Sequence, residues 1–262
     1  FHTSSLKLDS TSKRKLVDEF NSNTELCKLT EDFVFTFAFM ENETNDTYSK
    51  GHVEFEKLIS DNAFKKEVLS LKYKFMTKND ALLHGDLHTG SIMLNQNDTY
   101  VIDPEFSFVG PFGFDIGALL GNLIMSFTSH IALKSDDSYK QWILDTIEEV
   151  LEKFESKFLK LWDESNESAL VTPNIIDDSY LSQYKQEFMK DIMSESAGFA
   201  GCKMTRRMFG IAGVADIREI EDLKIRDEAI RLTLNISKRF VKEHKDIKTR
   251  EDIINIIKEE TK

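Results

Sequence analysis

The sequence predicts a mainly helical α+β fold with a small β element near its middle. Apolar residues recur at helical spacing from Phe114 onward, while several short apolar runs before that point are separated by turn-forming residues. The chain has only three prolines and no stretch rich in glycine and serine, so no internal boundary is marked. Residues 1–262 are therefore predicted to form one domain.

The first part of the chain predicts one strand, one connection and one helix. Residues Glu31 to Phe39 are rich in Phe and Val, which favours a strand. Residues Thr44 to Gly51 are polar and predict a surface connection. A helix is then expected from about Phe55 to Met76.

Three short apolar runs predict the β element itself. A Gly-Asp pair follows the first run, and the turn-forming pair Asn97-Asp98 separates the last two. We expect small strands around loops at Ala81 to His84, Ile92 to Leu94 and Tyr100 to Ile102.

The second half of the sequence predicts a helical body. An amphipathic, core-facing helix is indicated by apolar residues at helical spacing, namely Trp142, Ile143, Ile147, Val150, Leu151, Phe154, Phe158 and Leu161. Further helices are expected at Asp178 to Ala197, Met204 to Asp216, Asp222 to Val241 and Thr249 to Glu260.

Two smaller patterns within these helices carry predictions of their own. Gly117 and Gly121 are four residues apart in an apolar helix, a spacing that permits close approach of another helix. The charge-rich run Lys238 to Lys248 predicts a solvated helix end and loop.

Charge and cysteine usage exclude several classes of protein. A net charge of −12 argues against a nucleic-acid or anionic-membrane partner, because both present negative surfaces. Cys27 and Cys202 are too few for a disulfide framework and lack the spacing of a zinc site. The longest apolar stretch, Ile116 to Phe127, is too short to span a bilayer, and no signal segment opens the chain. The sequence thus predicts a cytoplasmic protein.

The segment that carries chemistry is His84-Gly85-Asp86-Leu87-His88, followed by Asp103-Pro104-Glu105. A carboxylate on a tight glycine turn, with two more carboxylates 17 and 19 residues further on, suits phosphoryl transfer. One carboxylate would orient the accepting hydroxyl, and the other two would hold magnesium on the phosphates. Isolated acids usually cap turns or lie on the surface, but this combination predicts a site.

The protein-kinase template differs from this segment at two positions. The template has an Asn five residues after the catalytic Asp and a Gly at the end of Asp-Phe-Gly. Here Ser91 stands in place of the Asn and Glu105 in place of the Gly. Glu105 offers a second carboxylate for the metal in compensation for the missing Asn.

Several stretches of the sequence resemble one known family. They are Glu25 to Asp32, Leu82 to Leu94, Val101 to Gly117 and Gly198 to Gly210. The chain resembles the C-terminal lobe of the 5-methylthioribose kinases, relatives of the aminoglycoside phosphotransferases and choline kinases. His-Gly-Asp-Leu-His is common to that wider superfamily. Thr89-Gly90-Ser91, Asp-Pro-Glu and the pair Arg206-Arg207 are similar to the methylthioribose kinases in particular.

The resemblance implies a protein-kinase-like C-terminal lobe and a role for each motif residue. Asp86 would be the catalytic base, and Asp103 and Glu105 would bind Mg²⁺, with ATP as co-substrate. Arg206 and Arg207 would contact the sugar, because guanidinium groups grip hydroxyls and offset charge on the transferred group.

Other interpretations of single residues stay open from the sequence. The arginine pair also suits a helix-surface ion pair with Asp216 or Glu219. Asp115 resembles the superfamily Asp that braces the catalytic loop, although it also suits the N-cap of the following helix. His84, His88 and Ser91 are interpreted as supports of the loop. At Gly213 the family commonly has His, which bears on the shape of the sugar pocket.

An N-terminal β-rich lobe that holds ATP is not recognisable. Only 83 residues precede His84, and they contain no Gly before Gly51, whereas a glycine-rich loop needs that backbone freedom. Together with Phe1 in place of Met, this predicts a C-terminal fragment with little activity alone, in which residues 1–54 form the connection from a missing lobe.

The resemblance therefore implies ATP-dependent phosphorylation of the C1 hydroxyl of 5-methylthioribose in methionine salvage, and it also implies a homodimer. Two alternatives stay open. An aminoglycoside or choline phosphotransferase would need an acidic pocket for a cationic substrate, whereas Arg206 and Arg207 favour a neutral polyhydroxylated one. A non-catalytic kinase-like module is disfavoured by the intact Asp86, Asp103 and Glu105.

Overall fold

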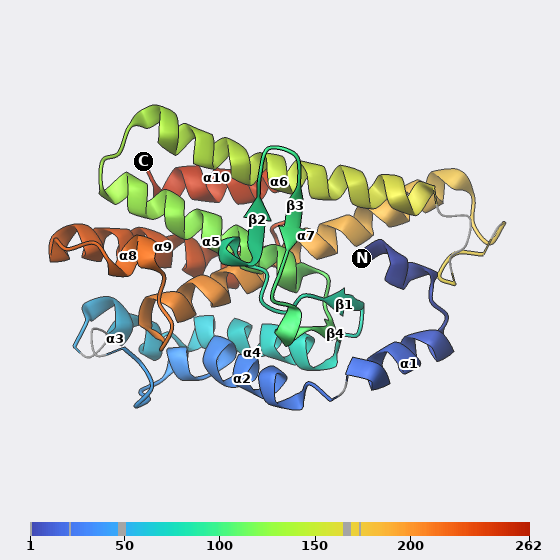
Figure 1. The fold of residues 1–262 in the computed structure, drawn as a ribbon, viewed down its shortest axis with the longest axis horizontal. Helices are drawn as coiled ribbons and strands as arrows, with labels where there is room; N and C mark the ends of the chain where they lie inside the picture. Colours follow the sequence, from blue (N-terminus) through green and yellow to red (C-terminus); the bar gives the residue numbers. More distant parts are fainter. Residues whose placement is uncertain (1, 21, 47–50, 165–168, 173) are drawn as a thin grey trace.

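A computed structural model describes residues 2–20, 22–46, 51–164, 169–172 and 174–262 (Figure 1). Three long helices form its centre: α5 (Gly113–Ala132), α7 (Asp178–Phe209) and α9 (Leu223–Glu243) pack against one another. Helices α6 (Asp137–Asp163) and α10 (Arg250–Glu260) lie along one side of this group, and α2 (Thr24–Phe35) and α4 (Asn62–Thr77) along the other.

The remaining elements are short. The further helices are α1 (Ser10–Phe20), α3 (Val53–Ser60) and α8 (Ala215–Arg218). The 3₁₀ helices are η1 (His2–Lys7), η2 (Phe37–Phe39), η4 (Thr89–Ser91) and η5 (Pro104–Phe106). The strands are β1 (Ala81–Leu83), β2 (Ile92–Leu94), β3 (Thr99–Val101) and β4 (Phe108–Gly110).

Two antiparallel pairs make up the β element. Strand β1 pairs with β4, with Leu83 opposite Phe108, and β2 pairs with β3, with Ile92 opposite Val101. The three predicted strands are therefore confirmed to within one residue at their ends. Strand β4 was not predicted.

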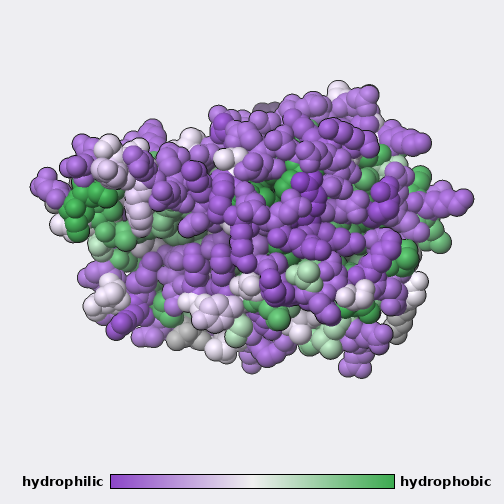
Figure 2. Space-filling model, turned by 180° about the vertical axis from the view of Figure 1, so that it is seen from behind, coloured by the Kyte–Doolittle hydropathy of each residue, from purple (hydrophilic) through white to green (hydrophobic). Residues whose placement is uncertain are grey.

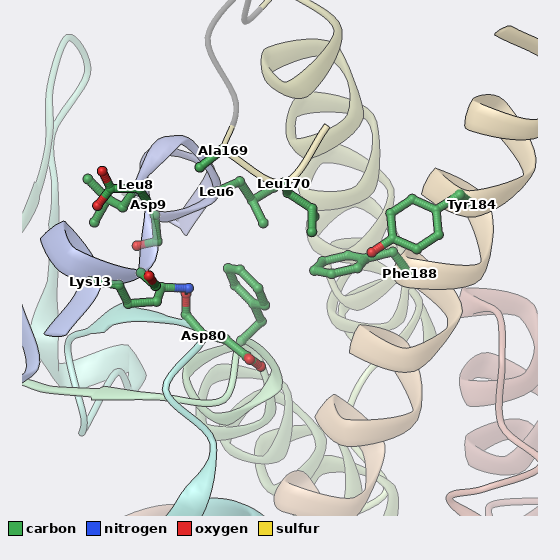
Figure 3. A pocket seen from close by; sticks show the side chains of 12 residues that line it. Leu6, Leu8, Asp9, Lys13, Asp80, Ala169, Leu170, Tyr184 and Phe188 are labelled. Carbon is green, nitrogen blue, oxygen red and sulfur yellow. The ribbon is translucent and has the colours of Figure 1, made fainter. Parts of the chain in front are cut away.

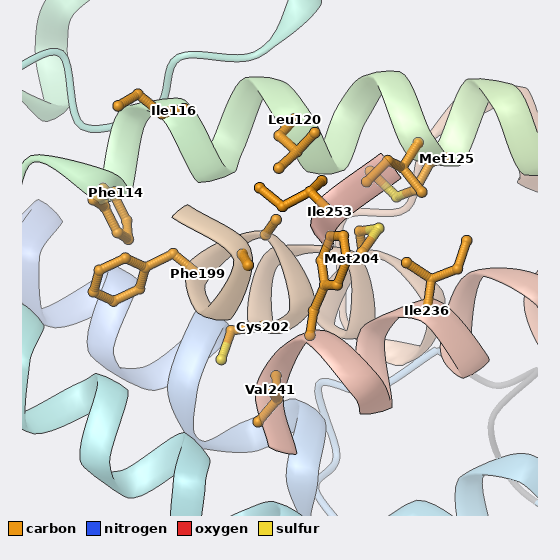
Figure 4. Packing of buried hydrophobic residues seen from close by; sticks show 14 of the residues in the cluster. Phe114, Ile116, Leu120, Met125, Phe199, Cys202, Met204, Ile236, Val241 and Ile253 are labelled. Carbon is orange, nitrogen blue, oxygen red and sulfur yellow. The ribbon is translucent and has the colours of Figure 1, made fainter. Parts of the chain in front are cut away.

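Side chains of the central helices interdigitate in one apolar core (Figure 4). The residues shown there include Phe114 and Leu120 from α5, Phe199 and Met204 from α7, Ile236 from α9 and Ile253 from α10. The mainly helical fold with a small β element is thus confirmed.

Close approach of α5 and α7 depends on two glycines, as predicted. A Cβ atom at Gly117 would lie 2.7 Å from the Ser196 carbonyl oxygen, and one at Gly121 would lie 3.2 Å from that of Ala200. The backbones of the two helices therefore meet where these positions lack a side chain.

The predicted strand at Glu31 to Phe39 is wrong. This segment is the end of α2 followed by η2. Val34 and Phe35, and then Ala38 and Phe39, are buried, which places apolar pairs four residues apart as a helical turn requires. The abundance of Phe and Val was a weaker signal than this spacing.

Two helix boundaries also differ from the prediction. The helix expected at Phe55 to Met76 is divided into α3 and α4 at Asp61, whose carboxylate accepts the Phe64 N–H at 2.9 Å and caps α4. Conversely, the helices expected at Asp178 to Ala197 and Met204 to Asp216 are joined in the single helix α7. This helix ends at Phe209, so the second prediction is wrong for residues 210–214, which form a non-helical connection to α8. Gly198 and Gly201 pack against Leu71 and Val241 instead of ending the helix.

The outward faces of two helices were predicted less well. On α6, Trp142 and Leu161 are 59% and 50% exposed, so they do not face the core as predicted. The run Lys238 to Lys248 is not simply solvated, because Lys238 binds Glu54 at 3.2 Å and Lys245 binds Glu67 at 2.8 Å. These pairs join α9 and its C-terminal end to α3 and α4.

The face opposite that of Figure 1 is largely hydrophilic, with hydrophobic residues in separate small groups (Figure 2). No helix in the described part of the chain is both long and apolar enough to cross a membrane. Of the polar connection predicted at Thr44 to Gly51, residues 47–50 lie outside the described residues.

Candidate active site

The loop that follows β1 is held by one buried carboxylate. Asp115 is 2% exposed, and its two carboxylate oxygens accept the backbone N–H groups of His84 at 2.7 Å and Gly85 at 2.9 Å. Asp115 lies in the first turn of α5, whose N-cap is Phe112. Its carboxylate therefore braces the loop and does not serve as the N-cap.

Gly85 brings this loop against the acidic turn at η5. Its φ of +87° favours glycine, and a Cβ atom at this position would lie 2.0 Å from the Phe106 carbonyl oxygen. His84 adds a second tie, since its Nε2 lies 2.8 Å from the carbonyl oxygen of Ile102. The loop around Asp86 and the turn that begins at Asp103 are thus adjacent.

His88 and Ser91 fold the rest of the loop onto itself. The Nδ1 atom of His88 accepts the Gly90 N–H at 3.0 Å, and the buried Ser91 hydroxyl donates to the Asp86 carbonyl oxygen at 3.1 Å. Ser91 also accepts the Ile102 N–H at 3.0 Å through its own carbonyl oxygen. The side chains predicted as loop supports therefore all bond to loop backbone.

The Asp86 carboxylate lies beside a buried lysine. The Nζ atom of Lys203 is 2.9 Å from Oδ1 of Asp86, and it lies 4.7 Å from the centre of the Phe114 ring. The Lys203 side chain is only 8% exposed, whereas that of Asp86 is 28% exposed. The other carboxylate oxygen, Oδ2, is 3.6 Å from Nε2 of His88.

Lys203 decides the ionisation of Asp86. Burial alone would raise the pKa of Asp86, but the ammonium of Lys203, with smaller contributions from Arg207 and His88, lowers it to about 2. Burial also lowers the pKa of Lys203, and the charge of Asp86 opposes that shift. Asp86 is therefore a carboxylate at neutral pH.

Lys203 was missed in the sequence, although a signal was present. It lies in α7 within Gly198 to Thr205, where the remaining residues are all uncharged and the whole run is buried. A single lysine within such a run is seldom fully buried without a charged partner. That partner is Asp86, which precedes it by 117 residues.

Arg206 and Arg207 follow at the end of α7. Arg207 donates to the Ala212 carbonyl oxygen at 3.1 Å, and Nε of Arg206 is buried without a hydrogen-bond partner among the described residues. In that part of the chain neither arginine forms an ion pair with Asp216 or Glu219, so this alternative is not realised. Burial and the repulsion of Arg207 lower the pKa of Arg206 to about 10.

Asp103 and Glu105 form an exposed acidic turn. Asp103 has a left-handed backbone, with φ of 63°, and precedes η5, in which Glu105 lies. Within the described ranges, no three His, Cys, Asp or Glu side chains are gathered as a ready-made metal site. Two exposed carboxylates nevertheless suit Mg²⁺, which is usually bound by one or two carboxylates together with substrate phosphates.

Two of the cavities differ in their position relative to these residues. A cavity of about 360 Å³ is lined by Arg207, Arg218 and Arg226. Another of about 540 Å³ lies between η1, α1 and α7, with Lys13 and Asp80 on one side and Tyr184 and Phe188 on the other (Figure 3). None of the predicted site residues lines this second cavity.

A helical domain that holds a braced Gly-Asp loop beside an acidic turn has the arrangement of a phosphotransferase. In agreement with this class, residues 44–151 match the model of the phosphotransferase enzyme family. The chain is 38% identical over 253 residues to the methylthioribose kinase of Geobacillus thermodenitrificans, covering 96% of the chain and 60% of that relative. It is 40% identical over 250 residues to methylthioribose kinase 1 of Oryza sativa subsp. japonica, covering 92% and 58%.

The chain is thus similar to the methylthioribose kinases over most of its length, and to the phosphotransferase enzyme family over residues 44–151. The resemblance predicted from its motifs is thereby confirmed. The chain spans about three fifths of the length of the curated relatives it matches.

Proposed function

We propose that this chain carries the acceptor side of a kinase that transfers a phosphoryl group from ATP to the C1 hydroxyl of 5-methylthioribose, a step of methionine salvage. The observation that carries the proposal is the Asp86 carboxylate, held ionised by Lys203 beside the Asp103–Glu105 turn. The similarity to methylthioribose kinases supports the choice of acceptor.

Asp86 is proposed to receive the acceptor hydroxyl. Lys203 donates a hydrogen bond to Oδ1 of Asp86, which leaves Oδ2 to accept a hydrogen bond from the acceptor hydroxyl. That bond would orient the hydroxyl oxygen towards the phosphorus atom. As the new O–P bond forms and the bond to the nucleoside diphosphate breaks, the hydroxyl proton passes to Oδ2. A carboxylate with a pKa of about 2 is a weak base, so orientation is its larger contribution, in keeping with a loose transition state.

Asp103 and Glu105 are proposed to hold Mg²⁺. Their exposed carboxylates lie on a turn that Gly85 packs against, so a metal held there adjoins the loop that carries Asp86. Bound Mg²⁺ would neutralise the charge of the phosphates.

The charge around Asp86 separates the proposed acceptor from the alternatives. Lys203, Arg206 and Arg207 surround a single carboxylate and would repel the cationic groups of choline or an aminoglycoside. The same guanidinium groups can donate to the hydroxyls of a neutral sugar. A non-catalytic role is disfavoured, because Asp86, Asp103 and Glu105 are all present.

Isothermal titration of the chain with three acceptors tests this proposal. We expect binding of 5-methylthioribose and none of choline or an aminoglycoside. Arg206→Gln should weaken sugar binding by about tenfold, the effect of one lost charged hydrogen bond. Arg231→Gln is the matched control, because Arg231 is exposed on α9 and pairs only loosely with Glu228 at 3.8 Å. Binding of choline or an aminoglycoside without binding of the sugar would reject the proposal.

The homodimer implied by the resemblance is also proposed here. Sedimentation velocity of the chain over a range of concentrations measures its mass in solution. A mass that stays at the 30.2 kDa of one chain would contradict the dimer.

A further inference from the structure

The cavity of about 360 Å³ beside Arg207 is lined by an unusual excess of cations. Arg207 from α7, Arg218 from α8 and Arg226 from α9 contribute three guanidinium groups, and Asp46 is the one acidic side chain in its lining. The chain as a whole carries a net charge of −12, so the charge at this cavity is opposite in sign to the net charge of the chain.

Gly213 makes room for one of these arginines. A Cβ atom at Gly213 would lie 1.7 Å from Nε and 2.3 Å from Cδ of Arg218, so the Arg218 side chain lies directly over the glycine backbone. Any side chain at position 213 would displace it.

Arg218 is fixed in this position by two further contacts. Its Nη2 donates to the Gly210 carbonyl oxygen at 2.6 Å, and its Nη1 lies 2.8 Å from Oδ2 of Asp46. The Asp46 backbone N–H in turn donates to the Phe209 carbonyl oxygen at 2.9 Å. The guanidinium group is therefore pre-positioned at the cavity before any ligand binds, which lowers the entropic cost of binding.

The positive charge at this cavity is incompletely compensated. Burial lowers the pKa of Arg207, the charge of Asp86 opposes that shift, and the repulsion of the nearby Arg218 adds to it. Arg207 gives one hydrogen bond to a described residue, to Ala212, although a guanidinium group carries five N–H donors. An anion in the cavity would relieve the repulsion and use the remaining donors.

We propose that this cavity is an anion site for a phosphate group, with Arg207 and Arg218 as its principal ligands and Gly213 as the position that admits Arg218. Guanidinium forks match the oxygens of a phosphate better than a single-atom halide, because they donate two parallel hydrogen bonds. The phosphate could be free inorganic phosphate or the phosphate of a sugar ester. Only the second source rests on the proposed function, because a sugar phosphate is its product.

Titration calorimetry with inorganic phosphate tests the site directly on the chain, at constant ionic strength set with chloride. We expect saturable binding of phosphate that Arg218→Gln weakens by about tenfold or more and that Arg231→Gln leaves unchanged. Gly213→Ala is expected to weaken binding as well, because its Cβ displaces Arg218 without removing any charge.

Two results would overturn the site: no phosphate binding to the wild-type chain, or equal binding by wild type and Arg218→Gln. Circular dichroism verifies the fold of each variant. If Arg218→Gln is unfolded, Arg218→Lys and Gly213→Ala decide instead, and unchanged phosphate binding by both would reject the proposal.

Ribose 1-phosphate in place of inorganic phosphate separates the two sources. Tighter binding of the ester than of inorganic phosphate supports a sugar phosphate, and equal binding supports the free ion. Failure of the proposed function is distinguishable, because phosphate would then bind through Arg218 while 5-methylthioribose would not bind.

Discussion

Asp86 keeps its charge in a half-buried position because one ammonium group lies 2.9 Å away. Removal of that group by Lys203→Met leaves the burial and takes away the attraction, so the pKa of Asp86 should rise from about 2 to above its ordinary value near 4. Carbon-13 NMR titration of the aspartate carboxyls measures this shift. Lys203→Arg is the control and should keep the pKa low, whereas an unchanged pKa in Lys203→Met would contradict the account.

The same pair gives stability a defined dependence on pH. Because the folded pKa of Asp86 lies below the unfolded one, the contribution of the pair is present above about pH 4 and is lost as the pH falls towards 2. Lys203→Met should abolish that loss.

At the scale of residues, the site residues that lie together in one short motif could be predicted from the sequence. Asp86, Asp103 and Glu105 lie within 20 residues of one another, and a tight glycine turn marks the first. Lys203 could not be found in the same way, because its proximity to Asp86 arises only when α7 packs on α5. Arg218 was missed for the same reason, since nothing in the sequence shows that it lies over Gly213.

At the scale of elements, the approach of the loop after β1 to η5 depends on the absence of a side chain at Gly85. Gly85→Ala combines a φ of +87° with a Cβ placed 2.0 Å from the Phe106 carbonyl oxygen, so it should lower the free energy of unfolding by about 3 kcal/mol or more. Urea unfolding measures this change.

Gly51→Ala is a matched control for that substitution. Gly51 has a similar φ of +77°, but among the described residues beyond its chain neighbours no atom lies within 4 Å of its added Cβ. The free energy of unfolding should therefore fall by only about 1–2 kcal/mol, the cost of a left-handed backbone conformation for a residue with a Cβ atom. Equal losses in the two variants would show that the contact with Phe106 is not what requires glycine.

Helix boundaries were the least predictable part of the elements. Gly198 and Gly201 are weak helix formers, and their presence favoured a break that the structure does not have. In α7 they face Leu71 and Val241, so close packing offsets their low propensity. Helix propensity describes single residues and takes no account of a contact with a helix elsewhere in the chain.

At the scale of the whole molecule, a fully buried histidine is the C-cap residue that follows α9. His244 is 0% exposed, and burial together with Lys74 and Lys245 lowers its pKa to about 4. The folded chain therefore binds fewer protons than the unfolded chain between pH 6.5 and 4, so the free energy of unfolding should fall as the pH falls through that window.

His244→Gln removes the titrating group and should flatten this dependence. Urea unfolding at several pH values between 4 and 6.5 gives the slope for the variant and the wild type. The same slope in both would mean that His244 is not the group responsible.

The overall arrangement followed from periodicity, because long amphipathic segments predict helices well. The excess of positive charge around Asp86 could not be predicted from the composition, because the chain is acidic overall and its net charge does not show a local cluster of cations. Lys203, Arg206 and Arg207 come from one end of α7, and Arg218 joins them only through the turn at Gly213.

The most direct test of the central claim is a single-turnover experiment with the chain in excess over ATP, in the presence of Mg²⁺ and 5-methylthioribose. Phosphorus-31 NMR follows the phosphorylated sugar, and the high protein concentration makes slow transfer visible. We predict sugar phosphate with the wild type and a rate at least about a hundredfold lower with Asp86→Asn. Equal rates in the two proteins, or transfer to choline or an aminoglycoside and not to the sugar, would contradict the account.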